Sequence, residues 1–135
     1  MKTKLITMTL LLTGTLIFSM ITGFQDKKPW PVPDKYVKME NPVKPDEESI
    51  NKGKSLYIKN CQSCHGKTGK GDGPKSAQLD TPPENFLKGD ILNQTDGELF
   101  YKISEGRKDM PASKKKITDP NDIWSITNYI KTFKK

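Results

Sequence analysis

The residues best suited to chemistry form one pentapeptide, Cys61-Gln62-Ser63-Cys64-His65, which holds every cysteine and histidine of the chain. Two thiols at this spacing can add to the vinyl groups of a haem. The neighbouring imidazole can then reach the haem iron as an axial ligand. The C-x-x-C-H spacing therefore predicts one covalent haem c, attached through Cys61 and Cys64 and bound to iron through His65.

Three other uses of the pentapeptide fit the sequence less well. A structural zinc site needs four ligands, mostly Cys and His, and this chain has two cysteines and one histidine. A thioredoxin-like dithiol is expected in a βαβ context, which the sequence lacks, and it leaves His65 without a role. A disulfide across so short a span is strained. Haem attachment remains the preferred interpretation, on the condition that the chain is exported.

The N-terminal residues have the pattern of a secretory signal. Lys2 and Lys4 precede an uncharged, largely apolar run over residues 5–25. Ile21 is bulky where a cleavage site has a small residue, and the run is close to the ~20 residues of a membrane-spanning helix. Residues 1–23 are therefore predicted to be a signal peptide or an uncleaved signal-anchor. Both alternatives place the remaining chain in the periplasm or on the outer face of the cytoplasmic membrane.

The remaining chain is short, polar and basic. The formal net charge is +7 for all 135 residues and +5 without residues 1–23, and the mean hydropathy is −0.72. A chain of this size and polarity buries little apolar surface by itself, and a covalent haem at the centre of the core would supply more. An exported haem protein is not expected to bind nucleic acid.

Residues 24–46 and 47–135 differ in character. The first stretch contains five of the ten prolines and is expected to be an extended tether, hydrogen-bonded mostly to water. Trp30 and Tyr36 are its candidates for packing back on the domain. The second stretch is expected to be a domain of short helices and long loops, with essentially no sheet because no segment alternates polar and apolar residues.

The first expected helix spans about residues 46–60 and leads directly into the pentapeptide. Acidic residues at its start favour a helix N-terminus by their charge. Gly53, Tyr57 and Cys61 fall on one face at helical spacing. A glycine inside a helix either weakens it by about 1 kcal/mol or lets another helix approach closely, and both interpretations of Gly53 stay open at this point.

Two further helices are expected after the pentapeptide. One starts at Thr95, which forms a capping box with Glu98, and stops at Gly106. The other has Asp119 as its N-cap and Pro120 at its first position. Its apolar stripe consists of Ile123, Ile126, Ile130 and Phe133, flanked by Trp124 and Tyr129.

Bis-histidine ligation is excluded, because the chain has no second histidine, and a methionine is the candidate for the second axial ligand. Outside residues 1–23 the methionines are Met39, in the proline-rich stretch, and Met110, between the second and third expected helices. Met110 follows His65 by 45 residues, which lets the chain reach the opposite face of the haem. Pro111 stiffens this loop. The sequence therefore predicts Met110 as the ligand opposite His65, against the alternative that it fills the core.

The chain over 47–135 resembles class I c-type cytochrome, the mono-haem cytochrome c domain of short bacterial type. The resemblance rests on the pentapeptide, on Gly53 with Tyr57, on Met110-Pro111 and on the aromatic last helix. It implies an all-α cytochrome c fold, with three to five short helices wrapped around one covalently attached haem. It also implies that the first and last helices cross at Gly53, with aromatic side chains on either side.

The resemblance also suggests supporting residues. Family members donate a hydrogen bond from Nδ1 of the proximal histidine to a proline carbonyl in the loop after the motif, and Pro74 matches that position. Tyr101 and Arg107 are candidates for contacting the haem propionates. The glycine-rich run 66–73 follows no expected strand and lacks a phosphate-loop pattern. Its expected role is to turn the chain beneath the haem edge.

These residues predict a one-electron carrier that serves protein redox partners outside the cytoplasm and is not itself an enzyme. Lysines near the expected haem edge either steer a partner with an acidic docking surface or form an ordinary solvated surface. One alternative is a haem-bearing subunit of a larger respiratory or dehydrogenase complex. Another is a haem enzyme or sensor with an open iron site, which ligation by Met110 argues against.

Overall fold

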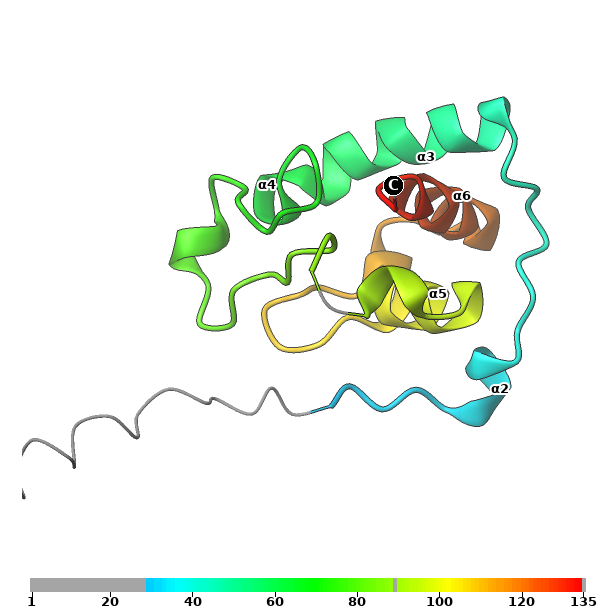
Figure 1. Cartoon of the computed structure of the whole chain (residues 1–135), viewed down its shortest axis with the longest axis horizontal. Coiled ribbons are helices and arrows are strands. Elements are labelled where there is room, and N and C mark those ends of the chain that lie inside the picture. Colours follow the sequence, from blue (N-terminus) through cyan, green and yellow to red (C-terminus); the bar gives the residue numbers. More distant parts are fainter. Residues whose placement is uncertain (1–28, 89, 135) are drawn as a thin grey trace, which may run out of the picture. The chain divides into compact units, whose positions relative to one another are not determined.

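The computed structural model describes residues 29–88 and 90–134, where it contains five α-helices and three short 3-10 helices (Figure 1). The chain divides into residues 1–30 and 31–135, and the second unit is described here. Within the described residues there is no β-strand, only an isolated bridge between Arg107 and Met110. The expected all-helical class is confirmed.

The predicted signal peptide or signal-anchor at residues 1–23 lies outside the described residues. Within the described ranges, no helix has the length and apolar character needed to cross a membrane.

Helix α3 (Glu47–Asn60) leads into the pentapeptide as expected. Its N-cap is Asp46, whose carboxylate accepts a hydrogen bond from the backbone N–H of Ser49 at 2.9 Å. This bond satisfies one of the unpaired N–H groups at the helix start. After Cys61 the chain forms the short helix α4 (Gln62–His65). The pentapeptide therefore continues from the end of a long, well-capped helix.

Helix α5 (Asp96–Glu105) has the predicted capping box. Glu98 N donates to the hydroxyl of Thr95, while the Glu98 carboxylate accepts from Thr95 N at 2.8 Å. The helix stops at Gly106, whose φ of 66° favours glycine. A local sequence signal thus defines both ends of α5.

Helix α6 (Pro120–Lys131) also starts as expected, with the carboxylate of Asp119 accepting a hydrogen bond from Asn121 N. In Figure 1, α6 lies between α3 and α5, and it packs against both. The apolar core lies around α6. The buried core cluster consists of Tyr57, Phe86, Leu92, Ile103, Ile117, Ile123, Ile126 and Ile130.

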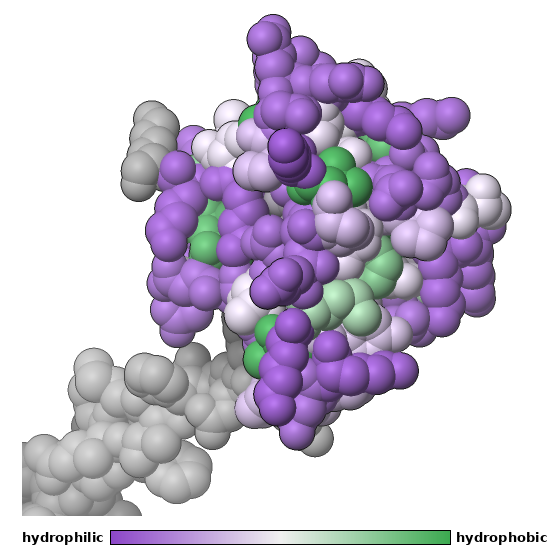
Figure 2. All heavy atoms as spheres, turned by 90° about the vertical axis from the view of Figure 1, so that its right-hand side faces the viewer, coloured by the Kyte–Doolittle hydropathy of each residue, from purple (hydrophilic) through white to green (hydrophobic). Residues whose placement is uncertain are grey.

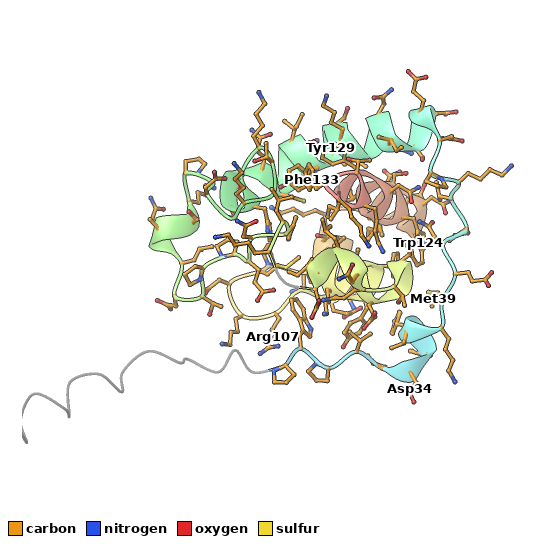
Figure 3. The ribbon with its side chains drawn as sticks, in the orientation of Figure 1. Asp34, Met39, Arg107, Trp124, Tyr129 and Phe133 are labelled. Atoms are coloured by element: carbon orange, nitrogen blue, oxygen red, sulfur yellow. The ribbon has the colours of Figure 1, made fainter. Side chains whose placement is uncertain are left out.

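Helices α3 and α6 cross at Gly53, as the resemblance implied. A Cβ atom at Gly53 would lie 1.9 Å from the carbonyl oxygen of Ser125, so only glycine fits there. Tyr57 packs edge-on against Tyr129, with ring centroids 5.3 Å apart. Trp124, the other candidate for the crossing, instead stacks on Phe100 of α5 at 4.0 Å. Figure 3 shows Trp124 well apart from Tyr129 along α6.

The proline-rich stretch differs from the extended tether that its composition suggested. Residues 31–46, named the strap here, contain helix α2 (Asp34–Val37) and pack on α5. The ring of Tyr36 lies 4.7 Å from that of Tyr101. A Cβ atom at Gly97 would lie 1.9 Å from the carbonyl oxygen of Tyr36, so strap and helix are in close backbone contact. The domain boundaries at 24 and 47 stay predictions.

Side-chain amides fix the second half of the strap. Asn41 donates to the side-chain oxygen of Asn128 at 2.7 Å and to the carboxylate of Asp96 at 3.3 Å. Asn128, which is only 3% exposed, donates in turn to the carbonyl oxygens of Val43 and Lys44. Buried amides bonded in this way hold backbone that would otherwise need water. The strap is therefore bound by partners far along the chain.

Candidate functional site

The pentapeptide forms one turn of helix with both thiols on it. Cys64 N and His65 N donate to the carbonyl oxygen of Cys61 at 3.1 and 2.9 Å. Cys61 and Cys64 are free thiols and half-buried. Burial, followed by the neighbouring Cys64, raises the pKa of Cys61 to about 12. A protonated, sheltered thiol of this kind is a poor exchange nucleophile.

The glycine-rich loop after the pentapeptide folds back onto its backbone. Gly71 N donates to the carbonyl oxygen of His65 at 2.9 Å, and Gly73 N donates to that of Cys64 at 3.1 Å. Gly66 and Gly71 have φ values of 78° and 75°, which glycine adopts without strain. The hydroxyl of Tyr57 donates to the carbonyl oxygen of Gly66 at 2.8 Å. Loop, pentapeptide and α3 therefore form one hydrogen-bonded unit.

The imidazole of His65 is sheltered but lacks the hydrogen bond that the resemblance implied. Its Nδ1 is buried and has no hydrogen-bond partner among the described residues. Burial lowers the pKa of His65, which favours the neutral imidazole. The structure does not contain the bond to the carbonyl of Pro74. The N–H groups on either side of Pro74 donate to the backbone of Cys64 and Ser63, which ties the loop to α4 instead.

Sequence reasoning missed the aromatic neighbour of His65. The ring of Phe86 stacks on the imidazole, with centroids 4.9 Å apart and planes 28° apart. Phe86 N also donates to the carbonyl oxygen of Gly69 at 2.7 Å. The only signal was a single aromatic residue after two prolines in a polar loop, and such a residue has no helical or strand periodicity to place it.

Met110 lies in a tight turn that follows α5. Arg107 N donates to the carbonyl oxygen of Met110 at 2.8 Å, and Met110 N donates back to that of Arg107 at 3.0 Å. The side chain of Met110 is half-buried and packs against the core cluster. Cys61 packs against the same cluster. The fold therefore brings the pentapeptide and Met110 to one apolar cluster, although the chain separates them by a long, irregular segment.

The donor set fits a c-type haem. Two free thiols, a neutral imidazole and a thioether are the groups that attach and ligate such a haem. A buried Nδ1 without a partner is costly in an ordinary core, and it shows that the imidazole is not held by the protein's own hydrogen bonds. Several half-buried apolar side chains surround the cluster and would offer contacts to a flat, apolar macrocycle. They are Leu56, Cys61, Ile91, Phe100, Met110, Tyr129 and Phe133.

The two candidate propionate contacts are placed in different settings. Tyr101 lies in α5 and packs against Tyr36 of the strap. Arg107 lies at the start of the turn that ends at Met110, and Figure 3 shows it below α5. Both roles stay predictions.

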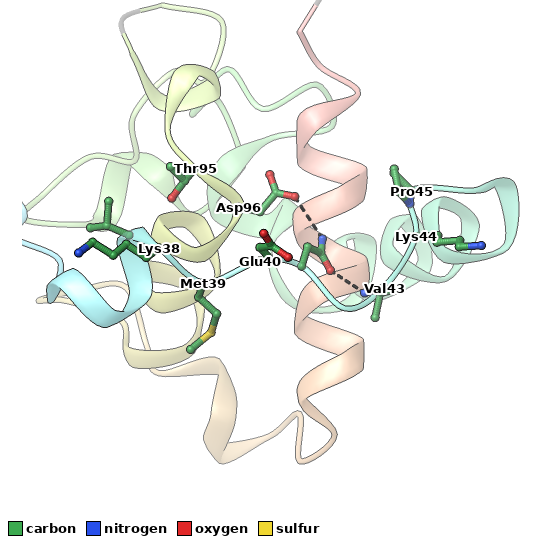
Figure 4. A pocket seen from close by; sticks show the side chains of 10 residues that line it. Lys38, Met39, Glu40, Val43, Lys44, Pro45, Thr95 and Asp96 are labelled. Carbon is green, nitrogen blue, oxygen red and sulfur yellow. Dashed lines mark hydrogen bonds between the residues drawn. The ribbon is translucent and has the colours of Figure 1, made fainter.

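One surface hollow lies away from these residues, between the strap and the start of α5 (Figure 4). It is lined by Val37, Lys38, Met39, Glu40, Asn41, Val43, Lys44, Pro45, Thr95 and Asp96. Figure 2 shows the side of the molecule at the right of Figure 1, where the described surface is mainly hydrophilic with small apolar areas. None of the candidate haem residues lines the hollow.

A family model described as cytochrome c oxidase, cbb3-type, subunit III matches residues 48–130. The chain belongs to this family. Its members contain a c-type cytochrome domain, so the resemblance drawn from the sequence and the expected cytochrome c fold are both confirmed, and the family implies haem c. No curated protein matches the chain.

Among solved structures, this cbb3-type subunit III domain is similar to a chain of the reducing HAO-like protein complex from Kuenenia stuttgartiensis. The TM-score is 0.62 and the sequence identity is 25%. The match covers 82% of this chain and 53% of that chain. The domain therefore spans about half the length of that relative.

Proposed function

We propose that the chain is a one-electron carrier outside the cytoplasm that uses a single haem c. Cys61 and Cys64 would hold the haem covalently, and His65 and Met110 would ligate its iron. The observation that carries the proposal is the shared apolar cluster, against which both Cys61 and Met110 pack. The match of residues 48–130 to a cytochrome family supports it.

When bound, the haem supplies the one-electron redox chemistry, and the protein supplies attachment, ligands and shielding. The pentapeptide presents both thiols and the imidazole from one helical turn, so one local element would both attach the haem and ligate its iron. The burial of the imidazole keeps it neutral, which is the form that can ligate a metal. Apolar side chains around the cluster exclude water, and such a shell influences the reduction potential.

The attachment is tested on the full chain expressed with its export signal and a cytochrome c maturation system. The denatured protein should retain haem on a gel stained for haem, and the mass should increase by one haem. The Cys61→Ala/Cys64→Ala variant should lose that stain. A matched control is Ser63→Ala, which changes the pentapeptide between the thiols and should keep the stain. Noncovalent haem in the unaltered chain would contradict the proposal.

A second candidate function is that of a haem-bearing subunit of a larger complex. It is favoured by the family, which is described as an oxidase subunit, and by the structural relative, which belongs to a protein complex. Purification from detergent-solubilised membranes distinguishes the two candidates. A subunit co-purifies with its complex in constant proportion through two columns, whereas a free carrier separates from other proteins.

A catalytic role requires an iron position that substrate can reach, and ligation by Met110 would close it. The reduced protein is therefore expected to bind carbon monoxide slowly or not at all. Prompt binding would favour an enzyme or sensor.

We also propose that the partner presents an acidic docking surface, because the net charge without residues 1–23 is +5. The rate of electron exchange with such a partner should fall as salt is raised. A rate that does not depend on salt would contradict this part of the proposal.

A further inference from the structure

We propose that Phe86 is a positioning residue for His65 and sets the plane in which its imidazole meets the haem iron. The inference rests on the proposed function, because His65 is an axial ligand only when the chain carries haem. It extends that function by assigning a role to a residue 21 positions beyond the pentapeptide, in a loop with no helical periodicity.

A histidine ligand needs a neighbour that fixes its ring. The torsion between Cβ and the imidazole ring has broad minima, so the side chain's own rotamer preference leaves the ring plane loosely defined. In metal-binding histidines, a hydrogen bond at the second ring nitrogen usually fixes the plane of the ring. In His65 the Nδ1 atom makes no such bond with any described residue. A stacked aromatic ring is another contact that can orient the imidazole.

Phe86 supplies a contact with the required geometry. Its ring lies 4.9 Å from the imidazole between centroids, and the planes differ by 28°. A face-to-face contact of this kind restricts rotation of the imidazole about its bond to Cβ, because rotation would drive one ring edge into the other ring. An aliphatic side chain of similar volume would fill the space but would not define a plane.

The phenylalanine ring is itself held in place. Phe86 is 9% exposed, and its other neighbour is the ring of Phe133, with centroids 6.3 Å apart and planes 27° apart. Gly69 closes the remaining side, because a Cβ atom there would lie 2.7 Å from the Phe86 ring and 2.9 Å from the Phe133 ring. The stack of His65, Phe86 and Phe133 therefore leaves the middle ring little freedom.

The backbone fixes Phe86 relative to His65 as well. Phe86 N donates to the carbonyl oxygen of Gly69 at 2.7 Å, and Gly71 N donates to the carbonyl oxygen of His65 at 2.9 Å. Two hydrogen bonds and one residue between them thus connect the two rings through the glycine-rich loop. This connection gives the loop a second role besides reversing the chain direction, because it fixes the position of Phe86 relative to His65.

The plane of an axial imidazole decides how its π orbital overlaps the iron d orbitals, and hence how unpaired spin spreads over the oxidised haem. The paramagnetic shifts of the haem-methyl protons report this distribution directly. We therefore expect Phe86→Leu to change the order and spread of the haem-methyl shifts in the oxidised holoprotein. Phe86→Tyr, which keeps the ring, should retain the wild-type order.

The matched control is Trp124→Leu. Trp124 stacks on Phe100 at 4.0 Å and is not among the side chains that would contact the macrocycle, so this variant breaks an aromatic stack elsewhere in the same core. It should lower stability without changing the order of the haem-methyl shifts. A second measurement needs no variant: the reduced holoprotein should show nuclear Overhauser effects between the ring protons of Phe86 and those of His65.

The outcomes distinguish a failure of the proposed function from a failure of the positioning role. A purified chain without covalent haem contradicts the proposed function. A chain with covalent haem that shows no Overhauser effect between Phe86 and His65 contradicts the positioning role alone. The same holds if Phe86→Leu binds haem and keeps the wild-type shift order, or if Trp124→Leu changes that order as strongly as Phe86→Leu does.

Discussion

At the scale of single residues, the thioether of Met110 is the group whose removal is most informative. Met110→Ala should lower the reduction potential, because a sulfur ligand stabilises ferrous iron relative to water or a nitrogen ligand. It should also let the reduced protein bind carbon monoxide promptly. Potentiometric titration and a carbon monoxide difference spectrum measure the two effects.

Met39→Ala is the matched control for Met110→Ala. Met39 lies in the strap and is 37% exposed, so its loss should leave both measurements unchanged. A Met110→Ala protein with the wild-type potential and spectrum would reject the ligand assignment.

The hydroxyl of Tyr57 is a second informative group, because it donates to the carbonyl oxygen of Gly66 from a fully buried ring. Tyr57→Phe should lower the free energy of unfolding by about 1 kcal/mol, as measured by denaturant titration. Burial raises the pKa of Tyr57 above its ordinary value of 10.0. The unfolded chain then loses this proton first, so wild-type stability should fall as pH rises above 10. That fall should be smaller in Tyr57→Phe.

Tyr129→Phe is the comparison for Tyr57→Phe. Its ring packs in the same aromatic group, but no hydrogen bond to its hydroxyl is present among the described residues. Equal losses of stability in the two variants at neutral pH would show that the bond to Gly66 contributes nothing specific.

At the scale of helices, the crossing of α3 and α6 depends on Gly53. Gly53→Ala places a methyl group where the carbonyl of Ser125 lies, so the helices must separate. Overpacking of this kind typically costs ~1–3 kcal/mol, and the backbone neighbour leaves little room for relief. The midpoint of thermal unfolding measures the loss. Lys54→Ala, at an exposed position of the same helix, should change it little, and a similar small change at Gly53 would mean that the helices do not meet closely there.

The strap depends on Asn128 in a comparable way. Asn128→Ala removes the donor to the carbonyl oxygens of Val43 and Lys44 and the acceptor for Asn41. Leaving buried polar groups without partners costs ~1–3 kcal/mol. We expect a lower unfolding midpoint and faster proteolysis within residues 38–46. The control is Asn121→Ala, at an exposed site of the same helix; equal proteolysis of the two variants would show that the strap is held by other contacts.

At the scale of the whole molecule, the sequence predicted those features that are encoded by neighbouring residues. The caps at Asp46 and Thr95 are examples, because a polar side chain and an N–H group a few residues away suffice to form them. The class of cofactor could also be predicted from neighbouring residues, because one pentapeptide supplies the thiols and the imidazole that indicate haem c.

What the sequence could not predict depends on partners distant along the chain. Asn41 and Asn128 are 87 residues apart, and no local pattern distinguishes a clamped proline-rich strap from a solvated tether. The contact between His65 and Phe86 also joins residues far apart in the chain, so no local pattern predicts it. Among the described residues His65 Nδ1 makes no hydrogen bond, and the backbone N–H groups beside Pro74 donate to Cys64 and Ser63. The role of Pro74 stays a prediction.

Because the strap is bound to the domain, the flexible spacer between a membrane anchor and the domain would be shorter. If residues 5–25 remain as a membrane anchor, a solvated stretch over 24–46 would reach at most about 80 Å, at roughly 3.5 Å per residue. Because residues 31–46 are bound to α5 and α6, at most residues 24–30 could act as a spacer, with a reach of no more than about 25 Å. The volume that the haem can sample falls roughly 35-fold, and its effective concentration near the anchor rises accordingly. Such a carrier would exchange electrons with immediate neighbours in the membrane rather than with distant ones.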